Sequence, residues 1–125
     1  MIEIIDKFKE ECGVFGIYSD SSSAAYDVYD GLYALQHRGQ ESAGIASIHQ
    51  GELLVRKRMG LVNAAISEED LAQLKGNISV GHVRYSTKGD SNVLNAQPLT
   101  AKSKFGSLAV AHNGTLINTN LIRSL

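Results

Sequence analysis

The segment at residues 42–48 has unusually small side chains, and this limits the folds open to the chain. Its apolar residues predict a strand, but Ala43, Gly44 and Ala46 leave little side-chain bulk on it. Another layer of the protein can approach such a strand closely. The segment therefore indicates a layered fold.

Four other strands are predicted. Residues 14–18 are apolar, β-branched and aromatic, which predicts a buried strand. The turn at residues 49–51 leads into residues 53–57, which return as the second strand of a hairpin. Residues 78–84 alternate between apolar and polar side chains. Residues 107–112 are nearly all small or apolar and predict a central strand buried on both faces.

A helical stripe follows the first strand. It is made of Ala25, Val28, Tyr29, Leu32 and Leu35. The serines at 19–23 offer an N-cap, and Gly39 is placed to end the helix. Gly31 lies inside the stripe and costs about 1 kcal/mol relative to alanine, so tertiary packing has to hold this helix.

Two shorter helical patterns come later in the chain. Ser67 precedes three acidic residues, which predicts a capped helix that stops near Lys75-Gly76. Ile117, Leu121 and Leu125 form a second stripe on which the chain stops. We expect from this pattern that the sequence is a fragment of a longer protein. Since no regular βαβ alternation occurs, the fold class expected is α+β.

Composition narrows the possible functions. A length of 125 residues, 43% of them hydrophobic, suits one globular domain. The net charge of -1 gives no reason to expect a nucleic-acid or membrane partner. Neither a secretory signal nor a run of about 18 apolar residues is present, and the single cysteine fits a reducing compartment. We therefore expect a cytoplasmic protein.

Several strand ends combine a glycine with a polar group, as binding sites often do. Each also has an ordinary structural interpretation. Cys12 can be a small buried hydrophobe, Arg38 and Arg84 surface charges, and Asn113-Gly114 a tight turn. The histidines can be structural, or with Cys12 they can suggest zinc, although none has a closely spaced ligand partner.

Taken together, four motifs resemble the class II glutamine amidotransferase domain, which belongs to the N-terminal-nucleophile hydrolases. They are Cys12-Gly13-Val14-Phe15-Gly16, Leu35-Gln36-His37-Arg38-Gly39-Gln40-Glu41-Ser42-Ala43-Gly44, Gly81-His82-Val83-Arg84-Tyr85-Ser86-Thr87 and Ala111-His112-Asn113-Gly114. The form of the second motif is most similar to purine-biosynthetic members, whose second domain is a phosphoribosyltransferase. The sugar-aminating relatives, such as glucosamine-6-phosphate synthase, are an alternative. The resemblance implies a four-layer αββα fold, incomplete here.

The resemblance implies that residues 1–11 are a propeptide and that residues 12–125 are a glutaminase domain truncated at its C-terminal side. Cys12 would hydrolyse the side-chain amide of glutamine. A free thiol has a pKa near about 8.5, whereas an α-amine has a pKa of about 7.7–8.0 and can accept the thiol proton. A peptide-bonded nitrogen cannot accept it. The resemblance also implies autocatalytic cleavage between Glu11 and Cys12.

The other roles are also carried over from the family. Asn113 and Gly114 would stabilise the oxyanion, and the guanidinium of Arg84 would bind the α-carboxylate of glutamine. Tyr85 and Thr87 would belong to a glutamine lid. The expected neighbours of Cys12 are Arg38 and Gly39.

Other parts of the enzyme would lie outside this chain. They include the acidic group for the α-ammonium of glutamine and the phosphoribosyltransferase domain, with phosphoribosyl pyrophosphate and Mg²⁺. Any [4Fe–4S] cluster would also lie there, because one cysteine cannot hold one. No cofactor is expected in this chain. The full-length protein is expected to be a homo-oligomer. Its glutaminase site would release ammonia, which the phosphoribosyltransferase domain would use to make phosphoribosylamine. The fragment alone is expected to be inactive and to expose apolar surface. A non-catalytic domain that binds glutamine or a partner, and a metal-binding module, are the competing hypotheses.

Overall fold

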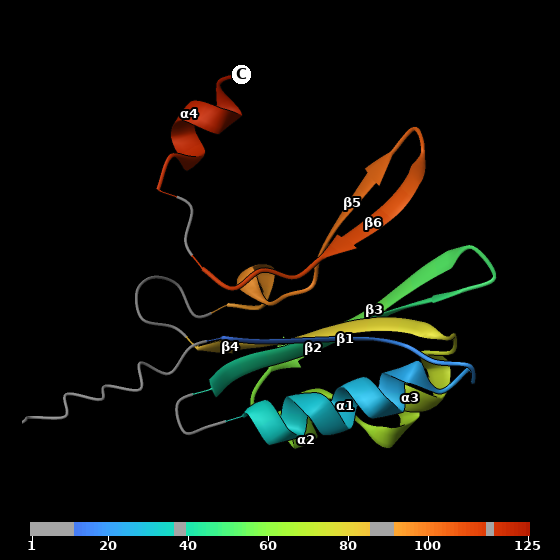
Figure 1. Cartoon of the computed structure of the whole chain (residues 1–125). Helices are drawn as coiled ribbons and strands as arrows, with labels where there is room; N and C mark the ends of the chain where they lie inside the picture. The colour runs from blue at the N-terminus through green and yellow to red at the C-terminus, as the bar shows by residue number, and fades with distance from the viewer. Residues whose placement is uncertain (1–11, 37–39, 86–91, 115–116) are drawn as a thin grey trace, which may run out of the picture.

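The centre of the molecule is an antiparallel four-stranded sheet. The computed structural model describes residues 12–36, 40–85, 92–114 and 117–125. The sheet has the order β1-β4-β2-β3, so that β4 and β2 are central and β1 and β3 are edges (Figure 1). The strands are β1 (Gly13–Tyr18), β2 (Gln40–His49), β3 (Glu52–Met59) and β4 (Ile78–Tyr85).

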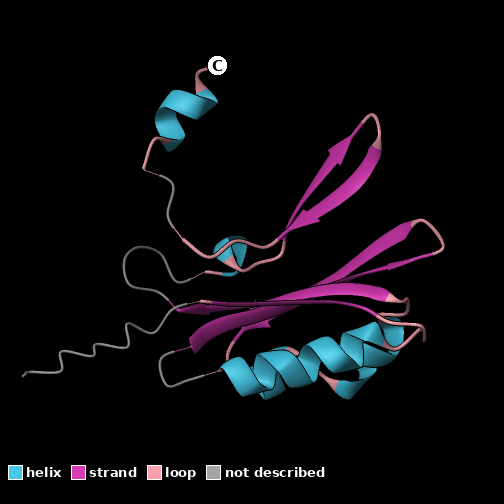
Figure 2. Ribbon diagram, in the orientation of Figure 1, coloured by secondary structure: helices cyan, strands magenta, loops and turns pink. Residues whose placement is uncertain are grey.

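One face of this sheet carries a layer of helices (Figure 2). They are α1 (Ala24–Leu35), α2 (Val62–Ala65) and α3 (Glu68–Gln73). The apolar stripe of α1 is buried against the sheet, where Val28 and Leu32 are fully enclosed. Ile45 and Val83 project from the central strands into the same core. Burial of this stripe is the main source of stability for the helix layer.

Two glycines let α1 approach the sheet. A Cβ on Gly31 would lie 2.6 Å from the ring of Phe15, and one on Gly81 would lie 2.5 Å from Val28. Real Cβ atoms do not approach other atoms so closely. The low helix propensity of Gly31 is therefore offset by the packing of Phe15 against it, as the sequence indicated.

A capping box begins α3 and connects it to the sheet. The Ser67 hydroxyl accepts the N–H of Asp70, and the Asp70 carboxylate accepts the N–H of Ser67, as predicted. The same carboxylate pairs with Arg58 of β3. The bond from Arg58, reinforced by those from Ser67, lowers the pKa of Asp70 to about 2.

The opposite face of the sheet is covered by the segment after residue 92. It contains a 3₁₀ turn (Val93–Asn95) and the hairpin of β5 (Leu99–Ser103) and β6 (Gly106–Val110). A Cβ on Gly44 would lie only 2.1 Å from the carbonyl oxygen of Gln97. The prediction that the small side chains of this strand admit another layer is confirmed. The helices, the larger sheet and the hairpin form three successive layers (Figure 1).

Several expectations for single elements were wrong. The strand β1 is not buried but alternates between half-buried and exposed residues, because it is an edge strand. The helix α1 ends at Leu35 rather than near Gly39, since Gln36 is already extended. Ser23 occupies its N-cap position, but its hydroxyl bonds the hydroxyl of Ser21 at 2.6 Å and makes no capping bond to the helix. The helix α3 ends at Gln73, short of Lys75-Gly76.

The strand expected at residues 107–112 was also misjudged. It corresponds to β6, which pairs only with β5 within the described part of the chain and is almost entirely exposed. An apolar sequence indicates burial only where a further layer covers it. Leu99 lies opposite Val110, and Ala101 opposite Leu108, so these four side chains share one face of the hairpin.

The last element, α4 (Thr119–Arg123), lies apart from the helix layer (Figure 1). It is shorter than the stripe that predicted it, and Ile117 and Leu125 lie outside it with 98% and 100% of their surface exposed. The expected exposure of apolar surface is therefore confirmed. Within the described residues, no helix is long and apolar enough to cross a membrane.

Candidate active site

Cys12 lies at the start of β1, at the edge of the sheet. Gly13 pairs with Val83, which places Cys12 beside the end of β4. The Cys12 thiol is half-buried and lies 3.8 Å from the carbonyl oxygen of Tyr85, to which it can donate a weak hydrogen bond. The thiol is thus held at a strand end rather than enclosed in the core.

Arg84 is the next-to-last residue of β4 and lies on the face opposite the helices. The alternation of this strand places it with Ile78, Val80 and His82, as predicted. Its Nη1 donates to the carbonyl oxygen of Asn95 at 3.0 Å. A guanidinium has five N–H donors, so this bond does not exhaust its capacity to bind a carboxylate.

Asn113 joins the C-terminal part of the described chain to Cys12. Its side-chain amide donates to the carbonyl oxygen of Cys12 at 2.6 Å, across 101 residues of sequence. Gly114 follows with a φ of +134°, a conformation that favours glycine. A Cβ there would also lie 3.2 Å from the ring of His112. The side-chain amide of Asn113 and the backbone of Cys12 are therefore in direct contact in the fold.

His82 lies beneath this loop. Only 1% of its surface is exposed, and its Nε2 lies 3.2 Å from the carbonyl oxygen of His112. Burial lowers the pKa of His82, which favours the neutral ring. The buried ring and its bond to the His112 carbonyl favour the structural interpretation of this histidine. No group of three or more residues of the His, Cys, Asp and Glu types is placed to hold a metal within the described residues.

The structure corrects the predicted placement of one site residue, and three other predicted site residues are not among those it describes. Tyr85 is the last residue of β4 and not part of a loop, and its side chain lies in the core on the helix face. Only its carbonyl oxygen faces Cys12. Arg38, Gly39 and Thr87 lie outside the described residues.

Sequence reasoning missed Asn95 and Gln97. Gln97 accepts the N–H of His112 through its side-chain oxygen at 2.6 Å. No motif pointed to either residue. Asn95 acts through its backbone carbonyl oxygen and Gln97 through its side-chain oxygen, and both lie on an irregular segment. Lys57 of β3, whose Nζ donates to the carbonyls of Ala96 and Pro98, gave no signal because its partners are backbone groups that only the fold brings to it.

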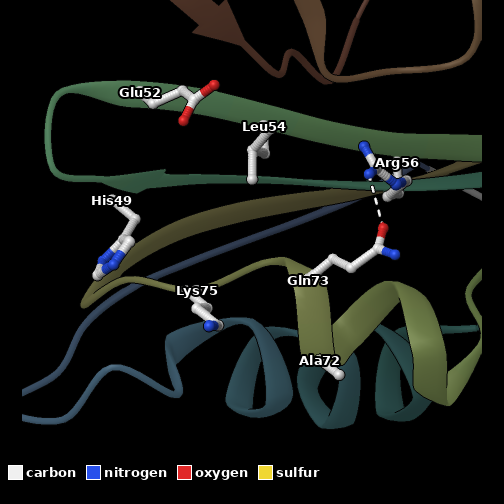
Figure 3. Close-up of a pocket in the computed structure, with 7 residues that line it drawn as sticks. All are labelled: His49, Glu52, Leu54, Arg56, Ala72, Gln73 and Lys75. Carbon is white, nitrogen blue, oxygen red and sulfur yellow. Dashed lines mark hydrogen bonds between the residues drawn. The ribbon is translucent and has the colours of Figure 1, made fainter.

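A separate groove lies between the β2–β3 hairpin and α3, away from Cys12 (Figure 3). Its volume is about 440 Å³, and it is lined by His49, Glu52, Leu54, Arg56, Ala72, Gln73 and Lys75. Arg56 is already bonded to the side chain of Gln73 at 2.8 Å. Of the predicted site residues that the structure describes, none lines this groove.

Comparison with known proteins identifies relatives of the chain. An amidophosphoribosyltransferase from Synechocystis sp. is 52% identical over 118 residues, which is 94% of this chain and 24% of that protein. The chain is a homologue of the N-terminal quarter of amidophosphoribosyltransferases. The enzyme of the same name from Methanothermobacter thermautotrophicus is 46% identical over 92% of this chain and 25% of its own length. No protein-family model matches.

Solved structures similar to this amidophosphoribosyltransferase homologue point to the same kind of enzyme as its sequence relatives do. Glutamine phosphoribosylpyrophosphate amidotransferase from B. subtilis, complexed with ADP and GMP, has a TM-score of 0.76 and 41% identity, over 89% of this chain and 24% of its own. A structure described as the allosteric regulatory enzyme of purine biosynthesis has a TM-score of 0.79 and 42% identity over the same shares. The expected α+β fold is confirmed by these matches. The chain spans about a quarter of the length of the relatives it matches.

Proposed function

We propose that this chain is the N-terminal part of the glutaminase domain of an amidophosphoribosyltransferase. The domain would begin at Cys12, with residues 1–11 as its propeptide. The observation that carries the proposal is the meeting of Cys12 and Asn113 at the end of β4, beside Arg84. Homology to enzymes of this name supports the same conclusion.

In the proposed reaction, the thiol of Cys12 attacks the side-chain carbonyl carbon of glutamine. A carbon–sulfur bond forms, the π pair of the carbonyl moves onto oxygen, and the thiol proton passes to the free α-amine of Cys12. That amine then returns the proton to the departing nitrogen as ammonia leaves. Water hydrolyses the resulting thioester to glutamate. The first residue therefore serves as both nucleophile and base.

The amide of Asn113 and the backbone N–H of Gly114 are the proposed oxyanion donors. Asn113 already bonds the Cys12 carbonyl through Nδ2, and an amide nitrogen carries a second hydrogen that can face the substrate. The unusual φ of Gly114 supports a specific direction for its N–H. Removal of one such donor typically lowers kcat about 10²–10³-fold.

The remaining roles complete the proposal. Arg84 binds the α-carboxylate of glutamine, and Arg38, Gly39 and Thr87 contribute as the family resemblance implies. Phosphoribosyl pyrophosphate and Mg²⁺ would bind to the phosphoribosyltransferase domain of the longer protein. Ammonia released at Cys12 would react there to form phosphoribosylamine, the first committed step of purine synthesis. Proteins of this kind are expected in the cytoplasm as homo-oligomers.

The test uses the longer protein that would carry this chain. Its native amino terminus is determined by N-terminal sequencing, and Cys12 is treated with a glutamine-like diazo-ketone. We expect the mature protein to begin at Cys12, to be labelled there, and to hydrolyse glutamine. The variant Cys12→Ser should retain the propeptide and lose hydrolysis. An active enzyme that still begins with Met1, or hydrolysis retained by Cys12→Ser, would reject the proposal.

A further inference from the structure

Both polar groups of the His112 backbone are held by side chains. Its N–H donates to the side-chain oxygen of Gln97 at 2.6 Å, and its carbonyl oxygen lies 3.2 Å from Nε2 of His82. A carbonyl oxygen can only accept a hydrogen bond, so Nε2 of His82 carries the hydrogen. His112 immediately precedes Asn113, and its backbone is fixed on two sides.

His82 is a rigid support because it belongs to a central strand. It lies in β4 on the face opposite the helices, with neighbours in both β1 and β2. Its ring is almost completely buried, and burial lowers its pKa. A neutral ring keeps one hydrogen-bond donor and can remain buried without the energetic penalty of an unpaired charge.

Gln97 is supported by three contacts of the segment around it. The backbone of Gln97 lies on Gly44 of β2, so closely that no Cβ could be accommodated. Lys57 of β3 donates to the carbonyl oxygens of Ala96 at 2.8 Å and Pro98 at 3.2 Å. Arg84 of β4 donates to the carbonyl oxygen of the neighbouring Asn95. Three strands of the sheet therefore fix the backbone from which Gln97 extends.

These contacts form a continuous path from the sheet to Cys12. The sheet holds His82 and Gln97, these two hold His112, and the next residue, Asn113, bonds the carbonyl of Cys12 at 2.6 Å. In the described part of the chain the thiol of Cys12 has its hydrogen bond with the carbonyl oxygen of Tyr85, and the bonds of His82 and Gln97 go to the His112 backbone. Their contacts instead bear on the direction in which the Asn113 amide and the Gly114 N–H point.

We propose that His82 and Gln97 are positioning residues that fix the His112 backbone so that Asn113 and Gly114 point at the oxyanion. This inference rests on the proposed function and adds two residues to it. A donor aimed at developing charge acts only when it is held in place before the reaction. A misplacement of about 1 Å can lower the rate about 10²-fold.

The experiment compares paired variants in the longer protein with free Cys12, by glutaminase kinetics. Gln97→Met removes the acceptor while keeping the length of the side chain, and Gln97→Glu keeps an acceptor oxygen. His82→Leu removes the donor, and His82→Gln keeps an N–H donor. We expect Gln97→Met and His82→Leu to lower kcat at least about 10-fold with KM for glutamine nearly unchanged, and the conservative variants to recover most of kcat.

A second measurement separates positioning from a general loss of structure. Each loss variant is combined with Asn113→Ala, which removes one of the donors being positioned. Positioning predicts that the additional loss in kcat becomes small in this background, whereas a general structural effect would multiply the two losses. Gln73→Met serves as the matched control, because Gln73 is a glutamine on α3 that bonds Arg56 away from Cys12.

The outcomes are distinct. An active parent in which Gln97→Met and His82→Leu keep kcat within about 3-fold would overturn the positioning role alone. The positioning role would also be overturned if these variants lost kcat by the same factor with and without the Asn113 side chain. A change in KM for glutamine without a change in kcat would overturn it as well. A parent enzyme that hydrolyses no glutamine would overturn this inference together with the proposed function.

Discussion

Arg84 shows how a single strand position combines two demands. In its proposed role it binds a substrate at the end of β4, and it is already bonded to the carbonyl of Asn95. Lysine could supply the charge but not two parallel N–H groups. We therefore expect Arg84→Lys to raise the KM for glutamine about 10-fold or more, with a smaller change in kcat.

Steady-state kinetics of glutamine hydrolysis by the longer protein measures this effect. Arg56→Lys is the matched control, since Arg56 lies on β3 on the helix side of the sheet and bonds Gln73. The control should leave KM unchanged. If Arg84→Lys also left KM unchanged, Arg84 would not be the carboxylate ligand.

Sequence reasoning at the residue scale was guided by motifs whose residue types can carry chemistry, and the catalytic and binding roles it assigned stay predictions. It selected Cys12, Arg84 and Asn113, and the fold places these side chains at one end of β4. It misplaced Tyr85, because a strand end cannot be told from the first loop residue by composition. It missed Gln97 because its role depends on a contact with His112 that only the folded segment creates.

At the scale of elements, the carboxylate of Asp70 is one of the groups that join α3 to β3. Asp70 closes the capping box of α3 and pairs with Arg58 of β3. Its pKa is lowered to about 2 in the fold, so its ionised form stabilises the folded state above the unfolded pKa of about 3.9. That contribution should disappear as the pH falls from about 4 to about 2.

We expect Asp70→Asn to lower the free energy of unfolding by about 1–2 kcal/mol at pH 7, since Arg58 is half-exposed and solvent weakens the pair. Urea unfolding from pH 7 downward should show the parent and the variant converging as Asp70 is protonated. Glu69→Gln is the control, because Glu69 is an exposed acid in the same first turn. A difference that persisted unchanged at low pH would contradict the role of the ionised carboxylate.

Sequence patterns predicted the helices and strands that pack one face against another part of this chain. The stripe of α1, the β2–β3 hairpin and the capping box of α3 were all located correctly. The short helix α2 was not anticipated, because four residues are too few to show a period. Burial of β6 was predicted wrongly, since composition alone does not show whether a covering layer is present.

At the scale of the whole molecule, apolar surface collects on the last third of the described chain. It includes Leu99, Phe105, Leu108, Val110, Ile117, Leu121 and Leu125. Large exposed apolar side chains favour association. The 125-residue chain should therefore self-associate and bind a hydrophobic dye such as ANS.

Light scattering after size-exclusion chromatography tests this expectation for the 125-residue chain. The double substitution Leu108→Thr and Val110→Thr should reduce association, because both side chains lie on one face of the hairpin. Tyr33→Thr, on the exposed surface of α1, is the control and should have no effect. A monomeric parent that binds no dye would show that this surface is not adhesive.

The edge position of β1 has a consequence for the proposed cleavage before Cys12. The strand pairs with β4 from Gly13 onward, and Cys12 stands just ahead of the first pair. Proteolysis at the bond before Cys12 would leave every described rung between the two strands intact. The sheet can thus acquire a charged ammonium group beside the sulfur while its own hydrogen bonding stays whole.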